Sequence, residues 1–135
     1  MQTITWAPEL ATGMAELDEL HRAMIDAVRQ VEQATDAQFA PAFRDFVAGV
    51  ENDFRSEEEA MELAHYPDAH IHCAHHARVL SALHHAQSRV MQGDIESGRH
   101  ALWLLFQWLT IHIETMDRAL ALACLKLRPA NAGAT

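Results

Sequence analysis

Apolar residues recur along most of the chain at the spacing of one face of an α-helix. Between the breaks they return every three or four residues, and no stretch shows the period of two that is typical of a strand. The breaks themselves contain proline, glycine or small polar residues. We therefore predict an irregular arm at residues 1–12, helices over about residues 18–35, 41–64, 68–91 and 95–127, and a frayed tail at 128–135.

The residues at the breaks set the expected helix ends. Pro41 suits the first turn of the second helix, because a proline there loses no helical hydrogen bond. Pro67 disfavours a helical conformation at Tyr66, so the second helix should end before that pair. Helices of about 20 residues are about 30 Å long, and short connections favour antiparallel neighbours. The pattern predicts an all-α chain in which residues 1–135 form a single domain, an up-down-up-down antiparallel four-helix bundle.

Each predicted helix carries a side chain of metal-ligand type on its apolar face. With about 100° of rotation per residue, His21 lies with Leu17, Met24 and Val28 on the first helix. His112 lies with Leu105, Trp108 and Met116 on the fourth. The other two faces each hold a pair of such residues: Phe39, Phe43, Phe46, Val50, Asp53, Glu57 and Met61 on the second helix, and His72, His76, Val79, Leu83 and Val90 on the third.

These polar positions have an ordinary interpretation and a metal-binding one. A single inward histidine is more often a hydrogen-bonded core residue than a ligand, and the pair His72 and His76 could arise by chance in a histidine-rich helix. Asp53 and Glu57 are harder to explain, because a buried carboxylate without a partner costs several kcal/mol. Imidazole and carboxylate together suit iron, manganese or zinc, and two carboxylates suit a pair of ions. The pattern favours a metal site.

Composition narrows the alternatives. The chain has 135 residues, ten of them histidine, and a formal net charge of −9. This acidity argues against nucleic acid or an anionic membrane as a main partner. Cys73 and Cys124 cannot form a disulfide framework, and neither a secretion signal nor an apolar run of membrane-spanning length is evident, so we expect a cytoplasmic protein. No motif of a hydrolase or nucleotide-binding protein is found.

The ordered set of motifs resembles the hemerythrin family, in particular the single-domain bacterial hemerythrins. The resemblance runs from Trp6 to about Asp117. Each piece alone is weak, but the set with these spacings is specific. In chain order the pieces are Trp6 and Gly13, Leu17-Asp18-Glu19-Leu20-His21, Phe54-Arg55-Ser56-Glu57-Glu58 with Met61, Tyr66-Pro67, His72-x3-His76, and Trp108 before His112-x4-Asp117.

The resemblance implies a four-helix bundle that holds two non-haem iron ions and binds dioxygen reversibly at one of them. His72, His76 and His112 would bind one iron, while Glu57 and Asp117, with an oxo or hydroxo group, would bridge both. His21 would bind the second iron, where dioxygen enters. The apolar wall of the oxygen pocket would include Leu17, Ile25, Leu105 and Trp108. Because Asp117 lies about 140° around an ideal helix from His112, both reach one site only near the bundle axis or across a locally widened turn.

One departure from the family pattern changes the expected chemistry. The family normally has histidine four residues before the bridging glutamate, where this chain has Asp53, and Leu20 replaces a residue that is often polar. We expect Asp53 to bind the second iron. Two ferrous ions with two carboxylates carry a charge of +2, and a third carboxylate lowers it to +1. The added anion stabilises the ferric state, so we expect a lower reduction potential and faster autoxidation.

Other functions remain open from the sequence. The same ligands could serve a di-iron oxidase or a peroxide-reducing enzyme, which catalytic turnover would reveal. A non-redox module that binds zinc or copper is a third possibility. Ferritin-like proteins need two Glu-x-x-His motifs, and only Glu62-x-x-His65 is present. We expect a monomer or a weak homo-oligomer whose ligand is dioxygen.

Overall fold

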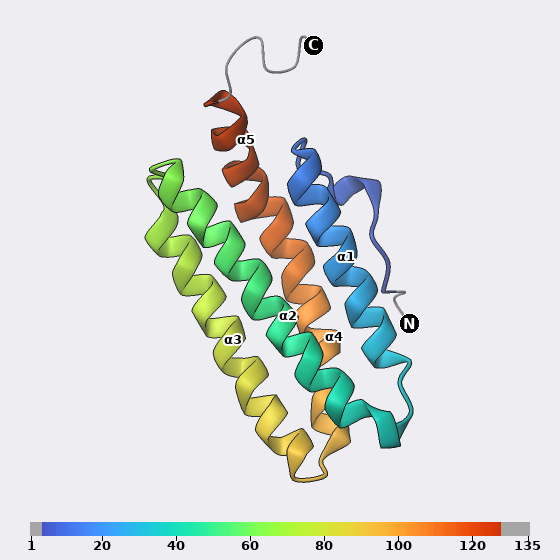
Figure 1. The fold of residues 1–135 in the computed structure, drawn as a ribbon. Coiled ribbons are helices and arrows are strands. Elements are labelled where there is room, and N and C mark those ends of the chain that lie inside the picture. Colours follow the sequence, from blue (N-terminus) through green and yellow to red (C-terminus); the bar gives the residue numbers. More distant parts are fainter. Residues whose placement is uncertain (1–3, 128–135) are drawn as a thin grey trace.

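A computed structural model describes residues 4–127, which form the predicted bundle (Figure 1). The arm contains one short turn, η1 (Pro8–Leu10). Four long helices come after it, with a π-helical turn and a short helix beyond the last of them. They are α1 (Ala15–Glu32), α2 (Asp36–Leu63), α3 (Ala69–Met91), α4 (Ile95–His112), η2 (Ile113–Asp117) and α5 (Arg118–Lys126).

The antiparallel up-down-up-down arrangement is confirmed. Short connections join α1 to α2, α2 to α3 and α3 to α4, and α5 continues the line of α4 toward the same end of the bundle as the start of α1 (Figure 1). No strand occurs in the range 4–127. The predicted tail at 128–135 and the first three residues of the predicted arm lie outside the described residues.

Two predicted helix starts were wrong. Helix α2 begins five residues before Pro41, because the Thr35 side chain accepts a hydrogen bond from the backbone N–H of Gln38 at 3.3 Å and so caps the earlier start. Phe39, within this added turn, is fully buried and stacks on Phe43, which secures the turn despite Pro41. Helix α1 begins three residues before Asp18 and also ends three residues before the predicted Thr35.

The arm packs on the bundle through its apolar side chains and two arginines. Ile4 and Leu10 are buried. The guanidinium of Arg22 lies 4.1 Å from the ring centre of Trp6, at cation–π distance. Arg118 donates a 2.5 Å hydrogen bond to the carbonyl of Glu9. The arm is therefore held against α1, beside which it lies in Figure 1, and against the start of α5.

Beyond His112, where α4 ends, the helix widens for one turn. Residues Ile113–Asp117 form a π-helix, after which α5 resumes the ordinary helical pitch. A π-turn adds a residue to the helical repeat and so rotates α5 about the rod axis relative to α4. His112 and Asp117, five residues apart, both become buried on the inner side. The structure thus contains the widened turn, one of the two arrangements that the sequence spacing allowed.

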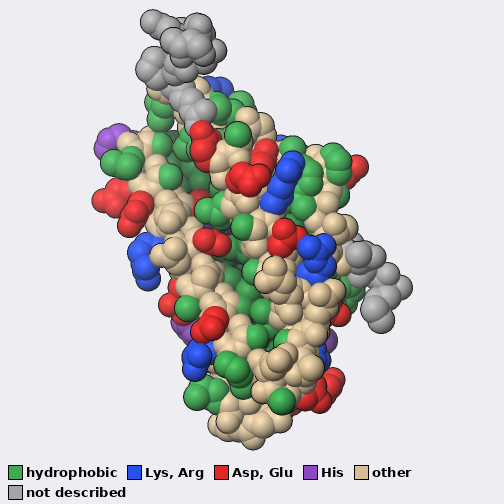
Figure 2. All heavy atoms as spheres, turned by 45° about the vertical axis from the view of Figure 1, so that its right-hand side comes forward, with side chains coloured by type: hydrophobic (Ala, Val, Ile, Leu, Met, Phe, Trp, Pro, Cys, Tyr) green, Lys and Arg blue, Asp and Glu red, His purple; other side chains and the backbone are tan. Residues whose placement is uncertain are grey.

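The chain has a formal net charge of −9, and its helices bury one face each. In the face shown in Figure 2, acidic side chains are widely spread, and hydrophobic side chains are visible in the furrows between the helices. Across the described range 4–127, none of the helices combines the length and the apolar character needed to cross a membrane.

Gly98 of α4 is buried where no larger residue fits. A Cβ atom at this position would lie 2.5 Å from a ring carbon of Phe39 and 2.5 Å from a methyl of Val90, and both neighbours are buried. We expect Gly98→Ala to lower the free energy of unfolding by about 1–3 kcal/mol, the usual cost of overpacking a core. Denaturant unfolding of the metal-loaded protein measures it.

Gly49 of α2 provides a matched control. It is helical and exposed, and a Cβ there would meet no atom within 4 Å. Gly49→Ala should raise the free energy of unfolding by about 0.5–1 kcal/mol, because alanine loses less conformational entropy in a helix. Equal effects of the two substitutions would contradict the packing argument.

Candidate metal centre

Buried ligand-type side chains from α2, α3, α4 and η2 converge in the interior of the bundle. One ligand atom from each of five residues lies within 4.8 Å of every other, and all five side chains are buried. They are Glu57, His72, His76, His112 and Asp117. His21 of α1, only 1% exposed, adjoins this group, since its Nε2 is 2.8 Å from Asp117 Oδ2. Six of the seven predicted ligands are thus brought together.

Asp117 faces two sets of histidines with its two oxygens. Oδ2 is the oxygen near His21, whereas Oδ1 is 2.9 Å from His72 Nε2 and 3.0 Å from His112 Nε2. Glu57 Oε1 lies 2.5 Å from His72 Nε2 and 3.4 Å from His76 Nε2. A carboxylate with its oxygens directed at two separate groups of donors has the geometry of a bridge between two ions.

The electrostatics of this group favour a positive charge among the carboxylates. Burial by itself raises the pKa of Asp117, but the imidazoles of His112, His21 and His72 outweigh it and hold the pKa well below its ordinary range. Burial by itself lowers the pKa of His72, but the two carboxylates outweigh it and raise the pKa to about 9. A proton on His72 therefore balances part of the carboxylate charge, and a bound cation would replace that proton.

The donor set fits a metal for a second reason. Three imidazole nitrogens at the centre, Nε2 of His72, His76 and His112, are fully buried and make no hydrogen bond within the described structure, although carboxylate oxygens lie within 3.4 Å of each. Leaving such groups unpaired costs about 1–3 kcal/mol each. A cation among them would supply the missing partner. Imidazole nitrogens mixed with carboxylate oxygens are ligands for iron, manganese or zinc.

Aromatic rings hold two of these histidines in position. Phe54 stacks on His76 with ring centres 3.9 Å apart and planes 6° from parallel. Trp108 stacks on His112 at 4.4 Å and 15°. These flat contacts restrict rotation of each imidazole about its ring-bearing bond. The resemblance to the hemerythrins implied that Trp108 lies in the apolar wall, but it gave Phe54 no role of its own.

Glu58 is a functional residue that the sequence pattern did not reveal. Helical periodicity predicts that, of Glu57, Glu58 and Glu59, only Glu57 turns inward. In the structure the Glu58 carboxylate accepts a 2.8 Å hydrogen bond from Nδ1–H of His76, which leaves Nε2 directed at the centre. Carboxylates in this position fix the tautomer of a ligating histidine and raise its basicity. The observed rotation of α2 about its axis places Glu58 next to Glu57, at the edge of the buried face of the helix.

We expect Glu58→Gln to weaken metal binding by about tenfold, the lower end of the effect of losing such a partner. Glutamine keeps an acceptor oxygen and the side-chain length but loses the negative charge. Competition with a chelator measures the affinity, and Glu59→Gln, at a neighbouring position on the same helix, is the control. Equal affinities for the two variants would contradict a positioning role for Glu58.

Asp53 lies beside the centre without joining its compact group. Its side chain is half-buried, and burial raises its pKa, with His21 lowering it and Glu57 raising it through their charges. Asp53 is thus within electrostatic range of both His21 and Glu57. Asp53 is not among the five residues whose ligand atoms converge. Whether it binds an ion stays a prediction.

Apolar side chains enclose the centre. Among the four residues predicted to line an oxygen pocket, Leu17, Ile25 and Leu105 are buried, and Trp108 is half-buried. A pocket of about 170 Å³ reaches Glu57 between α1, α2 and α5, and Leu17 and Leu20 contribute to its lining. Leu20, the departure from a polar residue noted in the sequence, makes this approach more apolar.

The fold and the centre together define a class: antiparallel four-helix bundles with a buried histidine–carboxylate metal site. Comparison with known proteins makes the class specific. The chain is 33% identical over 118 residues to the bacteriohemerythrin of Ralstonia nicotianae, a match that covers 87% of this chain and 86% of the relative. It superposes on a crystal structure of a hemerythrin point mutant with a TM-score of 0.83 at 21% identity, covering 92% of this chain and 98% of that one. No family model matches the sequence.

The chain belongs to the hemerythrin family, as a relative of the bacterial hemerythrins. The hemerythrin structure supports the fold alone, since its sequence identity is low. The resemblance based on the ordered motifs is therefore confirmed, and so is the four-helix bundle that it implied.

Proposed function

We propose that this protein binds two iron ions in its bundle and binds dioxygen reversibly at that centre, for carriage or sensing of oxygen. Membership of the hemerythrin family supports the proposal, as does the buried group of histidines and carboxylates. The single observation that carries it is the position of Asp117, whose two oxygens lie near His21 on one side and near His72 and His112 on the other.

In this proposal His72, His76 and His112 would hold one ion, and Glu57 and Asp117 would be ligands shared by both ions. His21 and Asp53 would hold the other ion, where dioxygen would bind. When bound, the two ions supply the electrons that reversible oxygen binding requires. The protein's own contribution is to fix the imidazoles by stacking and hydrogen bonding and to exclude water with the buried side chains of Leu17, Ile25 and Leu105.

Asp53 gives this site its own character in the proposal. A carboxylate replaces the neutral imidazole usual in the family, so the summed charge of two ferrous ions and their carboxylate ligands falls from +2 to +1. Negative charge beside iron stabilises the ferric state more than the ferrous state. We therefore propose that the oxygenated state decays by autoxidation faster in this protein than in relatives with five histidine ligands.

Iron loading under anaerobic conditions, followed by exposure to oxygen, tests the function. We expect about two ions per chain, an absorption band from the oxygenated centre, and recovery of the starting spectrum when oxygen is removed. Sustained consumption of oxygen or peroxide in the presence of a reductant would instead indicate an oxidase or a peroxide-reducing enzyme. Zinc or copper binding without a dinuclear iron centre would overturn the proposal in favour of a non-redox module.

A further inference from the structure

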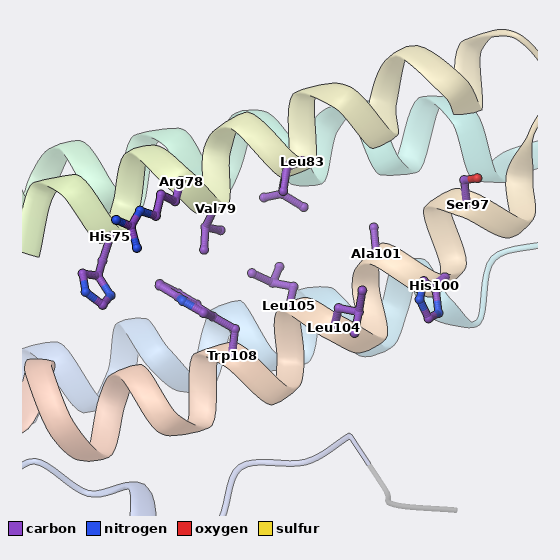
Figure 3. Close-up of a pocket in the computed structure, with 11 residues that line it drawn as sticks. His75, Arg78, Val79, Leu83, Ser97, His100, Ala101, Leu104, Leu105 and Trp108 are labelled. Carbon is purple, nitrogen blue, oxygen red and sulfur yellow. The ribbon is translucent and has the colours of Figure 1, made fainter.

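A second pocket lies outside the metal centre, in the groove between α3 and α4 (Figure 3). Its volume of about 500 Å³ falls within the range of about 300–1,000 Å³ that is typical of small-molecule sites. Apolar side chains of both helices face each other across it, and small residues leave the space open. The apolar lining consists of Val79, Ala82, Leu83, Ala101, Leu104 and Leu105, with the Trp108 ring at one end.

The ionisable residues that line this groove are all basic, namely His75, Arg78 and His100, in a chain whose net charge is −9. Arg78 carries the permanent charge, whereas burial and the neighbouring His112 and Arg78 lower the pKa of His75. Helix α3 contains no acidic residue, and α4 contains only Glu96. The groove is thus a local exception to the acidity of the protein. Its charge is complementary to an anion, and screening limits the influence of more distant acidic groups to about 8 Å at physiological salt.

The fixed positive charge is at one end of the groove. Arg78 extends from α3 beside His75 and above Trp108 (Figure 3). The described part of the chain provides no ion pair for its guanidinium. At the other end, Ser97 donates its hydroxyl to Asp94, which is also paired with Arg89. An anionic group therefore fits at the Arg78 end, with an apolar tail directed along Leu105 and Leu104.

From this arrangement we infer that the groove between α3 and α4 is a binding site for a free amphipathic carboxylate with a linear apolar tail. The guanidinium of Arg78 can hold a carboxylate with two parallel hydrogen bonds. The lining residues of α3 span His75 to Leu83, about 12 Å at 1.5 Å per residue, which suits a medium-length chain. The acidic surface elsewhere disfavours an anionic membrane as the source of this ligand.

The site adjoins the proposed iron centre without sharing its ligands. Trp108 contributes to the end of the groove and stacks on His112, and the His75 ring lies 6.4 Å from the His112 ring. A bound tail would therefore contact a ring that in turn contacts a ligand. Carboxylate binding depends on the shape and charge of the groove, and so it does not depend on which metal the protein binds.

Titration of the metal-loaded protein with laurate, followed by calorimetry below the micelle concentration, tests the inference. Dodecyltrimethylammonium, a probe with a similar tail and a positive head, is the control ligand. We expect one saturable laurate site per chain and at least about tenfold weaker binding of the cation. Equal binding of both probes, or no saturable laurate binding, would overturn the inference.

Variants locate the site. Leu104 is 49% exposed, so Leu104→Glu should fold normally while placing a like charge in the groove, and laurate binding should be lost. Leu122→Glu, at an exposed leucine of α5 outside the groove, should leave binding unchanged. Arg78→Gln should weaken laurate binding about fivefold, as expected for one partly exposed ion pair, whereas Arg44→Gln on α2 should have no effect.

Two further measurements separate other occupants of the groove. Analytical sedimentation should show that the protein is a monomer and that Leu104→Glu is a monomer too. The protein should not co-sediment with vesicles of phosphatidylglycerol. A dimer that Leu104→Glu dissociates would overturn the inference in favour of contact between two copies. Vesicle binding that depends on Arg78 would overturn it in favour of a membrane lipid.

Discussion

Asp117→Asn is expected to reduce the iron content from about two ions per chain to one or fewer. Asparagine preserves the size and shape of the side chain but removes the negative charge and one lone-pair donor that faces the ions. Loss of an outer hydrogen-bond partner of a ligand already costs about 10–100-fold in metal affinity, so loss of a bridging carboxylate should cost about 100-fold or more. Elemental analysis after anaerobic loading and desalting measures the change.

Glu114→Gln is the matched control, because Glu114 lies in the same π-helical turn with its side chain exposed. It removes the same charge from the same turn at a position that does not face the centre. Circular dichroism should show equal helix content in the two variants. If Asp117→Asn retained two tightly held ions, the bridging role of Asp117, and with it the dinuclear centre proposed here, would be refuted.

The second large effect concerns Asp53. Asp53→His should restore the more common nitrogen donor and raise the reduction potential by about 59 mV, which corresponds to a tenfold change in a one-electron equilibrium. It should also lengthen the lifetime of the oxygenated state. Asp53→Asn removes the charge without adding an imidazole and should move the potential in the same direction. Stopped-flow spectroscopy of the reduced protein with oxygen, together with redox titration, measures both quantities.

Asp45→His, at an exposed aspartate of α2, controls for an added histidine and a lost surface charge. It should leave the potential and the lifetime unchanged. A long-lived oxygenated band in the original chain that disappears in both Asp53 variants would contradict the charge argument. Such a result would show that Asp53 stabilises the oxygenated state.

The bundle and the approach of most site residues to one another could be predicted from periodicity. Glu57, His72 and His112 interrupt apolar stripes, and a side chain on the stripe of each helix must meet the others at the bundle axis. Helix ends were less predictable, because the start of α2 depends on a cap at Thr35 and on tertiary packing of Phe39. Sequence spacing alone favours Pro41, and the packing of Phe39 outweighs that preference.

The residues that hydrogen-bond the predicted metal ligands were the main features that the sequence pattern did not predict. Glu58 lies one residue after Glu57, about 100° around the helix, and a periodicity argument places such a residue toward solvent. Its hydrogen bond to His76 depends on the crossing of α2 with α3, which the sequence does not specify. The groove lined by Arg78 and Leu104 arises in the same way, from the separation of two helices whose individual patterns are ordinary.

The wide turn at Ile113–Asp117 has a consequence for assembly of the protein. It shifts the phase of the last helix relative to α4, and Leu120 and Ala121 of that helix are buried against the rest of the bundle. A π-turn interrupts the regular hydrogen bonding of the α-helix. The buried side chain of Asp117 anchors this turn in the interior of the bundle. Metal ions bound to Asp117 would therefore also stabilise the position of α5, so the metal centre would contribute to the stability of the fold as well as to ligand binding.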